Sequence, residues 1–297
     1  MLVDEQATTT SVAGTLSDEI DGLDALEVPA GHHRSLSRRT WSSAWPKLAA
    51  VLLAITAWQV VVWSGWKPEY ALAGPKPVFT ELWRLIRTGE LGSAARVTLG
   101  RAITGYLLAV AIGSVVGLAV ARVRFLRTAV GSLISGLQSM PSIAWFPLAI
   151  LMFQGGEGAI FFVVVLGAAP AIANGIISGV DQIPPLQIRV GRILGARGLS
   201  LLRHVIVPAS LPGVLAGLKQ GWAFAWRSLM AGELLVIVAG HRSIGVLLQT
   251  SRDISDVVML EAVMIAILVI GVLVDSMVFG AAERLVLRRR GLLAPLP

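Results

Sequence analysis

Apolar stretches of roughly membrane-spanning length alternate along the chain with short polar segments. A hydrocarbon core about 30 Å thick needs roughly 20 apolar residues in a helix. The pattern therefore predicts an all-α, polytopic membrane protein with a six-helix transmembrane domain in residues 46–290. The predicted spans cover residues 47–63, 99–121, 128–153, 159–180, 212–239 and 257–279.

The composition agrees with this pattern. Hydrophobic residues make up 55% of the chain and charged residues 14%, against about 25% charged residues in ordinary soluble domains; the mean hydropathy is +0.74. Cysteine is absent and the four histidines are scattered, so we expect no disulfide framework, thiol nucleophile or metal site. The net charge of +7 would ordinarily suggest nucleic-acid binding, but in a membrane protein the positions of Lys and Arg indicate orientation instead.

Basic residues gather in alternate connections between the spans. By the positive-inside tendency, both termini and the polar segment (residues 182–211) are predicted to be cytoplasmic, in a bacterial plasma membrane. Residues 1–45, in which acids precede bases, are predicted to be a disordered tail rather than a signal peptide, and residues 291–297 a short C-terminal tail. The basic residues are Arg34, Arg38, Arg39, Lys47, Arg122, Arg124, Arg127, Arg189, Arg192, Arg197, Arg203, Arg284, Arg288, Arg289 and Arg290.

Two loops on the opposite side contain helical patterns. In residues 63–94, apolar positions recur at helical spacing after Pro75 and Pro77. This pattern is compatible with an amphipathic helix on the outer surface and equally with a loop helix packed on its own bundle. The last outer loop, residues 241–256, is expected to hold a short re-entrant or surface helix.

Glycines and prolines within the spans indicate packing and bending. Pairs four residues apart, such as Gly175 with Gly179 and Gly213 with Gly217, predict close helix packing within the bundle. Prolines 141, 147 and 170 are expected to kink or break their helices. Since freed backbone groups in a membrane must face protein or a cavity, Pro141, with Gln138 and Ser139, is predicted to line a pathway.

Ionisable residues inside spans favour a functional interpretation. Arg101 and Lys219 lie near span ends and are expected to snorkel toward the membrane surface. Arg227 and Glu233 lie deeper and six residues apart, hence on different helix faces; Arg227 either favours an anionic solute or forms a buried ion pair. Glu261 and Asp275 complete this set. The predicted pathway residues are Gln138, Ser139, Pro141, Trp145, Trp226, Arg227 and Glu233.

No catalytic motif is apparent. The nearest approach to a phosphate-binding loop, from Gly213 to Lys219, has the wrong spacing and lies in a predicted span. There is neither a Gly-x-Ser-x-Gly elbow nor a His-Glu-x-x-His motif. We therefore expect no enzymatic activity and no bound cofactor in this chain.

The polar segment carries a spaced motif. Arg189-Val190-Gly191 is followed after three residues by Gly195 and after nine more by Val205-Ile206-Val207-Pro208. This resembles the Glu-Ala-Ala loop in the permease subunits of binding-protein-dependent ABC importers, with Arg189 in place of the family's glutamate. Leu137-Gln138-Ser139-Met140-Pro141 and Ala231-Gly232-Glu233 are similar to the nitrate, taurine and aliphatic sulfonate branch.

The resemblance implies that the polar segment is a coupling helix that docks on a separate ATPase, which binds ATP and magnesium. It also implies an extracytoplasmic solute-binding protein and a second permease copy, most simply identical. From the residues we expect two short helices, the second at 199–205 and stopped by Pro208. The predicted ATPase-coupling residues are Arg189, Arg192, Gly195, Ala196, Arg197, Gly198 and Pro208.

Alternative functions remain open at this stage. A basic loop that only anchors to anionic lipid would account for the arginines but not for the glycine and proline spacing. A secondary transporter or channel would need no ATPase, and a structural scaffold would carry no solute. The expected solute is small and anionic, of the sulfonate, taurine or nitrate type.

Overall fold

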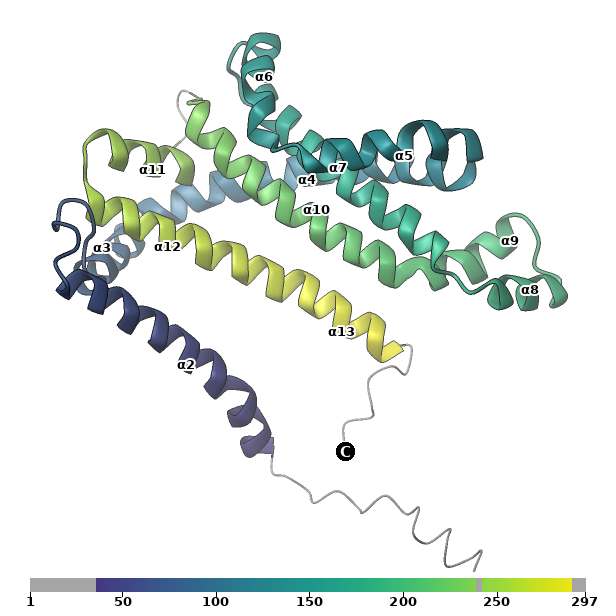
Figure 1. The fold of residues 1–297 in the computed structure, drawn as a ribbon, viewed down its shortest axis with the longest axis horizontal. Coiled ribbons are helices and arrows are strands. Elements are labelled where there is room, and N and C mark those ends of the chain that lie inside the picture. Colours follow the sequence, from purple (N-terminus) through teal and green to yellow (C-terminus); the bar gives the residue numbers. More distant parts are fainter. Residues whose placement is uncertain (1–35, 239–241, 290–297) are drawn as a thin grey trace, which may run out of the picture. The chain divides into compact units, whose positions relative to one another are not determined.

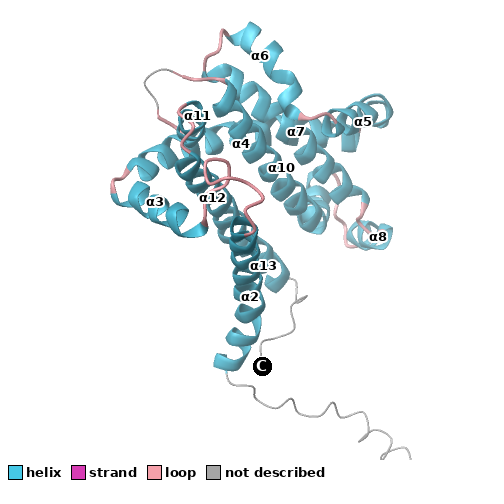
Figure 2. Ribbon diagram, turned by 60° about the vertical axis from the view of Figure 1, so that its left-hand side comes forward, coloured by secondary structure: helices cyan, strands magenta, loops and turns pink. Residues whose placement is uncertain are grey.

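The computed structural model describes residues 36–238 and 242–289, and these are arranged as helices joined by short connections (Figures 1 and 2). Most of the predicted tail 1–45 and all of 291–297 lie outside the described residues, as do Ala239 of the fifth predicted span and His241. Helix α2 (Leu36–Trp63) begins within the predicted tail. The all-α fold expected from the sequence is confirmed.

Two compact units divide the chain, Met1–Thr56 and Ala57–Leu296. Helix α2 crosses this boundary, and its apolar part, Trp45–Trp63, is long enough to span a membrane. The described part of the first unit is thus one helical segment. All of the remaining architecture belongs to the second unit.

The second unit contains four further uninterrupted helical stretches of membrane-spanning length. Helices α4 (Glu90–Arg122) and α7 (Glu157–Asp181) are continuous. Helix α10 (Val207–Leu235) follows α9 (Leu199–Leu201) and a π turn, η2 (Leu202–Ile206). Helix α12 (Val257–Val274) continues through a second π turn, η3 (Asp275–Phe279), into α13 (Gly280–Arg289).

The third predicted span is not one straight helix. Helix α5 (Arg124–Ser139) is followed by a 3-10 turn, η1 (Ser142–Trp145), and by α6 (Phe146–Phe153), with a bend of 100° between the two arms. Met140 is extended, with φ −82° and ψ 130°, because a residue that precedes proline is pushed out of the helical region. The expected break at Pro141 is confirmed, and counting this bent pair as a span gives six.

The other two prolines leave their helices continuous. Pro147 lies in the first turn of α6, where a backbone N–H group would have no hydrogen-bond acceptor within the helix. Proline, which lacks this group, therefore costs the helix no hydrogen bond there. Pro170 lies inside α7, which runs on to Asp181. Of the expected kinks or breaks, the structure confirms the break at Pro141, whereas neither Pro147 nor Pro170 interrupts its helix.

Helix α7 lies between α4 and α10 at the centre of the unit (Figure 1). Gly175 and Gly217 meet backbone to backbone where α7 crosses α10, as do Gly179 and Gly213 one turn away. A Cβ atom on Gly217 would lie 2.5 Å from Cα of Gly175, so neither position has room for a side chain. The predicted role of these glycines in bundle packing is confirmed.

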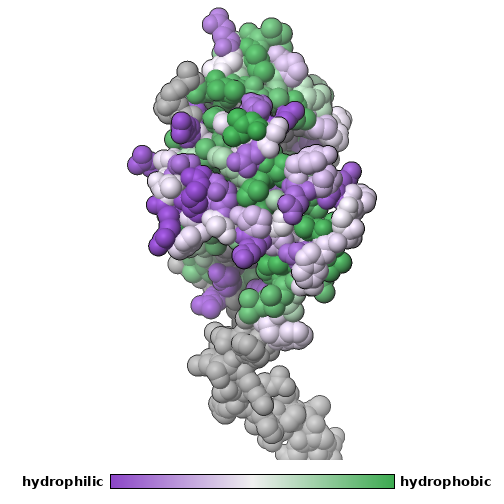
Figure 3. All heavy atoms as spheres, turned by 90° about the vertical axis from the view of Figure 1, so that its left-hand side faces the viewer, coloured by the Kyte–Doolittle hydropathy of each residue, from purple (hydrophilic) through white to green (hydrophobic). Residues whose placement is uncertain are grey.

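A smaller core forms where α3 (Pro75–Arg87) and α11 (Ile244–Asp253) pack on α12. Val78, Leu85 and Ile244 are fully buried there. Of the two interpretations of the loop at 63–94, the structure favours the helix packed on its own bundle. Seen from the side on which α3 and α11 lie, the surface mixes hydrophilic and apolar residues (Figure 3).

Candidate functional site

The polar segment folds into a helical hairpin, in which one short helix packs against the start of a long one. Helix α8 (Pro185–Ile193) ends just before Gly195, and Gly198 precedes α9. Both glycines have positive φ, +86° and +54°, a conformation that side chains disfavour. The N–H group of Ala196 closes the turn by donating to the carbonyl oxygen of Gly191 at 2.9 Å.

Gly191 is the contact point between the two arms of this hairpin. A Cβ atom there would lie 2.8 Å from Cγ2 of Val205 and 3.1 Å from Cδ1 of Leu201. Only a very small residue therefore lets α8 pack on the segment that follows α9. The spacing of the motif does not indicate this role, although Gly191 occupies a place at which the similar family has alanine.

The expected stop at Pro208 is wrong. Pro208 lies in the first turn of α10, and the helix runs from Leu199 to Leu235 without interruption. The π turn η2 precedes the proline, and the N–H group of Val207 donates to the carbonyl oxygen of Leu202. Such a turn, with hydrogen bonds from residue i+5 to residue i, lets the helix continue although Pro208 has no N–H group to donate. The polar segment is thus connected to α10 by continuous helix.

The tip of the hairpin exposes apolar and basic side chains together. Ile193, Leu194 and Leu199 are 83%, 80% and 78% exposed. Arg189, Arg192 and Arg197 surround them and are also exposed, and none of the three forms a salt bridge with another described residue. An exposed apolar patch rimmed by charge is typical of a protein contact surface.

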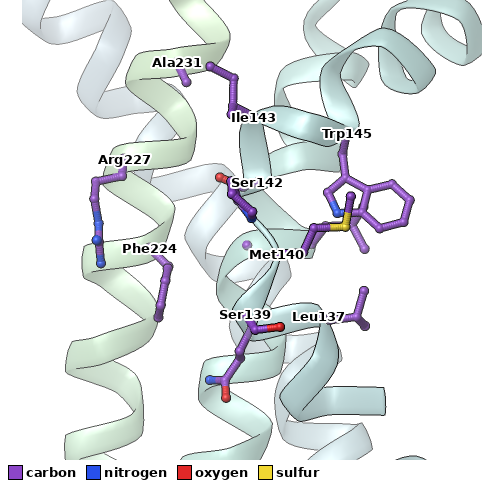
Figure 4. A pocket seen from close by; sticks show the side chains of 13 residues that line it. Leu137, Ser139, Met140, Ser142, Ile143, Trp145, Phe224, Arg227 and Ala231 are labelled. Carbon is purple, nitrogen blue, oxygen red and sulfur yellow. The ribbon is translucent and has the colours of Figure 1, made fainter. Parts of the chain in front are cut away.

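A cavity of about 260 Å³, called here the break cavity, opens where α5 gives way to α6. One wall consists of residues at the break, and α10 contributes Phe224, Arg227 and Ala231 to the other (Figure 4). Oγ of Ser228 donates to Oγ of Ser142 at 2.8 Å and ties α10 to the break. The predicted pathway residues that line this cavity are Gln138, Ser139, Pro141, Trp145 and Arg227.

Arg227 is an exposed cation in the middle of a membrane-length helix. Its Nε donates to the carbonyl oxygen of Ala223 at 3.0 Å, and its guanidinium lies 4.7 Å from the centre of the Phe224 ring. Among the described residues, no carboxylate lies within salt-bridge distance of it. Its side chain borders the break cavity and also a cavity between α10 and α12, and no described carboxylate forms an ion pair with it in either.

Two predicted pathway residues lie elsewhere. Trp226 is buried, stacks on Trp222 with ring centres 6.3 Å apart, and faces α12 rather than the break. Glu233 is completely buried. It forms an ion pair with Arg101 of α4 and does not line the break cavity, so its predicted pathway role is not supported.

Glu233 belongs to a buried polar network near the end of α10. Its Oε1 accepts from Arg101 at 3.2 Å, and its Oε2 accepts from Thr98 Oγ1 at 2.9 Å and from the N–H group of Gly245 at 3.1 Å. Arg101 also donates to Glu157 at 2.8 Å. The network joins α4, α7, α10 and α11.

Arg101 does not snorkel as expected, because its side chain is only 5% exposed and is held by two carboxylates. The structure places the remaining ionisable residues in contacts of their own. Lys219 lies 3.6 Å from Asp275 and 3.9 Å from Glu283. Glu261 accepts from the N–H group of Ala73 at 3.2 Å.

Residues 97–291 match the family described as the binding-protein-dependent transport system inner membrane component. The chain belongs to this family. It is therefore a multi-pass inner membrane protein and the permease component of an ABC importer, whose ATPase is a separate subunit and which works with a binding protein. The permease itself binds no cofactor.

Relatives that are named for different solutes resemble the chain to a similar extent. A putative ABC transporter permease of Methanocaldococcus jannaschii is 32% identical over 64% of this chain and 71% of its own. The nitrate import permease of Synechococcus elongatus is 28% identical over 64% and 71%. The riboflavin transport system permease of Chloroflexus aurantiacus is 29% identical over 86% and 93%.

The fold also matches a solved structure. The methionine ABC transporter MetNI in inward-facing conformations contains a chain that aligns with a TM-score of 0.55 at 20% identity. The alignment covers 69% of this chain and 96% of that one. At this identity the match concerns the fold alone.

Proposed function

We propose that the chain forms the translocation pathway for a small anionic solute of the sulfonate, taurine or nitrate type. The observation that carries the proposal is Arg227, an exposed cation that lines the break cavity without a carboxylate partner among the described residues. A charge inside a membrane is costly and usually lines a solute path or pairs with another charge. A solute anion would supply the missing partner.

The chemistry of the opposite wall supports the same solute class. Ser139, Ser142 and Gln138 line it, and hydroxyl and amide groups donate hydrogen bonds to oxyanions without adding negative charge. The nitrate relative is consistent with this assignment, whereas the riboflavin relative argues for testing it directly.

Uptake by the assembled importer tests the anion assignment. The permease is reconstituted with its ATPase and binding protein, and ATP-dependent entry of radiolabelled taurine, ethanesulfonate and nitrate is measured. Arg227→Gln is expected to lower entry of the transported anion about tenfold or more, a loss of at least one charge-assisted hydrogen bond. Arg252→Gln, a change at an exposed arginine at the end of α11, is the matched control.

Two outcomes would contradict this assignment. If uptake were unchanged in Arg227→Gln, Arg227 would not bind the transported anion. If none of the three anions were taken up, the proposed solute class would be wrong. Persistent uptake without the ATPase would instead favour a secondary transporter or channel.

The polar segment is proposed to be the surface that docks on the ATPase. Its exposed apolar tip suits a groove on a partner, and its continuity with α10 gives a rigid route from the docked tip to the break cavity. Ile193→Asp is expected to reduce co-purification of the ATPase severalfold. Ile254→Asp, at a residue 64% exposed after α11, is expected to leave it intact; equal effects would contradict the docking role.

Orientation and assembly complete the proposal. The concentration of arginine around the polar segment supports cytoplasmic placement of that segment and of both termini. Two identical permease copies would enclose the break cavity, which is only partly enclosed in the single chain. Protease protection of a C-terminal tag in sealed vesicles tests the orientation, and cross-linking of two differently tagged copies tests the homodimer.

A further inference from the structure

A second polar cavity lies between α7 and α10, closer to the polar segment. It has a volume of about 320 Å³ and adjoins the contact between Gly175 and Gly217. Asn174 and Ser178 line it from α7, Gln182 from the turn that follows α7, and Gln220 from α10. We call this cavity the amide groove.

The amide groove and the break cavity open on the same face of α10. Gln220 of the groove is followed at steps of four, three and four residues by Phe224, Arg227 and Ala231 of the break cavity. Residues at these spacings share one helix face. Asn174 and Ser178 are likewise four residues apart and share one face of α7, and Gln182 follows at the same spacing in the turn after the helix.

A hydrogen bond connects the two cavities. Nδ2 of Asn174, in the amide groove, donates to Oε1 of Gln138, in the break cavity, at 3.1 Å. Within the described part of the chain, the side chains of Ser178, Gln182 and Gln220 make no hydrogen bond. Polar side chains at membrane depth are expensive unless they line an aqueous path or find partners.

We propose that the amide groove is a second solute station, through which an oxyanion passes between Arg227 and the polar-segment end of the bundle. The inference rests on the proposed function. Its lining is neutral, so amide and hydroxyl groups would hold an anion more weakly than Arg227 does. Weak binding at successive sites is what lets a solute leave as well as enter.

Thiol labelling tests the station without knowledge of the natural solute, since the chain contains no cysteine. Ser178→Cys and Gln220→Cys are each made in the permease–ATPase complex and treated in inverted membrane vesicles. The probes are sulfonatoethyl methanethiosulfonate, which is itself a small sulfonate, and its cationic trimethylammonium analogue. Val115→Cys is the matched control, because Val115 is 71% exposed on the apolar helix α4.

Both groove cysteines are expected to react with the sulfonate probe at least about tenfold faster than the control cysteine at position 115. The control thiol lies in an apolar environment, and such an environment raises the pKa of a thiol and so leaves little of the reactive thiolate. Equal rates at all three positions would overturn the station. Ser178→Cys is nearly isosteric, so it preserves the test even if Gln220→Cys misfolds.

The station and the proposed function can fail separately. Fast labelling by both probes, with uptake insensitive to Arg227→Gln, would support an aqueous groove and contradict the anion assignment. Uptake that depends on Arg227, together with groove cysteines no more reactive than Val115→Cys, would keep the anion assignment and overturn the station.

Discussion

Arg101 and Glu233 face each other inside the protein, with Nη1 of the guanidinium 3.2 Å from Oε1 of the carboxylate. Their side chains are 5% and 0% exposed. Thr98 and the N–H group of Gly245 share the other carboxylate oxygen. A single carboxylate thus fixes the end of α10 against α4 and α11.

Removal of this carboxylate should be strongly destabilising. In Glu233→Ala, Arg101 keeps only the half-exposed Glu157, while Thr98 and the N–H group of Gly245 lose their acceptor. Breaking a buried ion pair costs about 3–5 kcal/mol. Thermal unfolding in detergent should therefore begin several degrees lower, and Glu233→Gln, which retains an acceptor oxygen, should lose less.

Glu81→Ala is the matched control for the Glu233 variants. Glu81 forms a salt bridge with Arg84 at 2.7 Å on α3, where the arginine is 46% exposed, and surface pairs contribute only about 0–1 kcal/mol. If Glu81→Ala and Glu233→Ala unfolded at the same temperature, the network would not hold these helices together.

Alanine is expected to have different effects at two glycines, one at the crossing of α7 and α10 and one in α4. In Gly217→Ala the new methyl group meets the backbone of Gly175, which cannot rotate away, and such overpacking costs about 1–3 kcal/mol. In Gly100→Ala no atom lies within 4 Å of the new methyl group, and alanine favours a helix by about 1 kcal/mol over glycine.

Chemical denaturation of both purified variants measures these effects. Gly217→Ala is expected to unfold more easily than the parent chain, and Gly100→Ala no more easily. A stable, monodisperse Gly217→Ala protein would show that the two helices can separate without cost.

The local sequence pattern predicts most of the helices but not how the polar segment joins α10. Apolar length alone predicts most spans, and the position of Pro141 within a span predicts the break. The sequence wrongly predicts a helix stop at Pro208, because a π turn just before a proline has no distinct local sequence pattern.

The polar network was hidden for a different reason. Arg101 finds its partners 56 and 132 residues away in the chain, a distance at which helical periodicity carries no information. One available signal was the placement of Thr98 and Arg101 three residues apart, hence on the same face of a largely apolar helix. That face predicts a buried acceptor on another helix, which the structure supplies as Glu233.

Gly191 offers a graded test of the polar segment. A methyl group there would press on the end of the Val205 side chain, which can move slightly, so Gly191→Ala should retain most ATPase binding. Gly191→Leu should force α8 away from Val205 and Leu201 and reduce ATPase co-purification severalfold. Gly92→Leu, at an exposed position with no atom within 4 Å, is the control; similar losses in both leucine variants would point to general misfolding.

A pair of proline substitutions separates the break from the rest of the third span. Pro141→Ala removes the ring that keeps Met140 extended, so α5 is expected to lengthen and the break cavity to close. Solute uptake should fall about tenfold, the loss expected when solute and Arg227 can no longer form a charge-assisted hydrogen bond, while ATPase co-purification stays unchanged because the polar segment is untouched. Pro147→Ala changes a first-turn position of α6 that needs no N–H partner, and uptake should persist. Equal uptake in both variants would mean that the bend at Pro141 is not what keeps the cavity open.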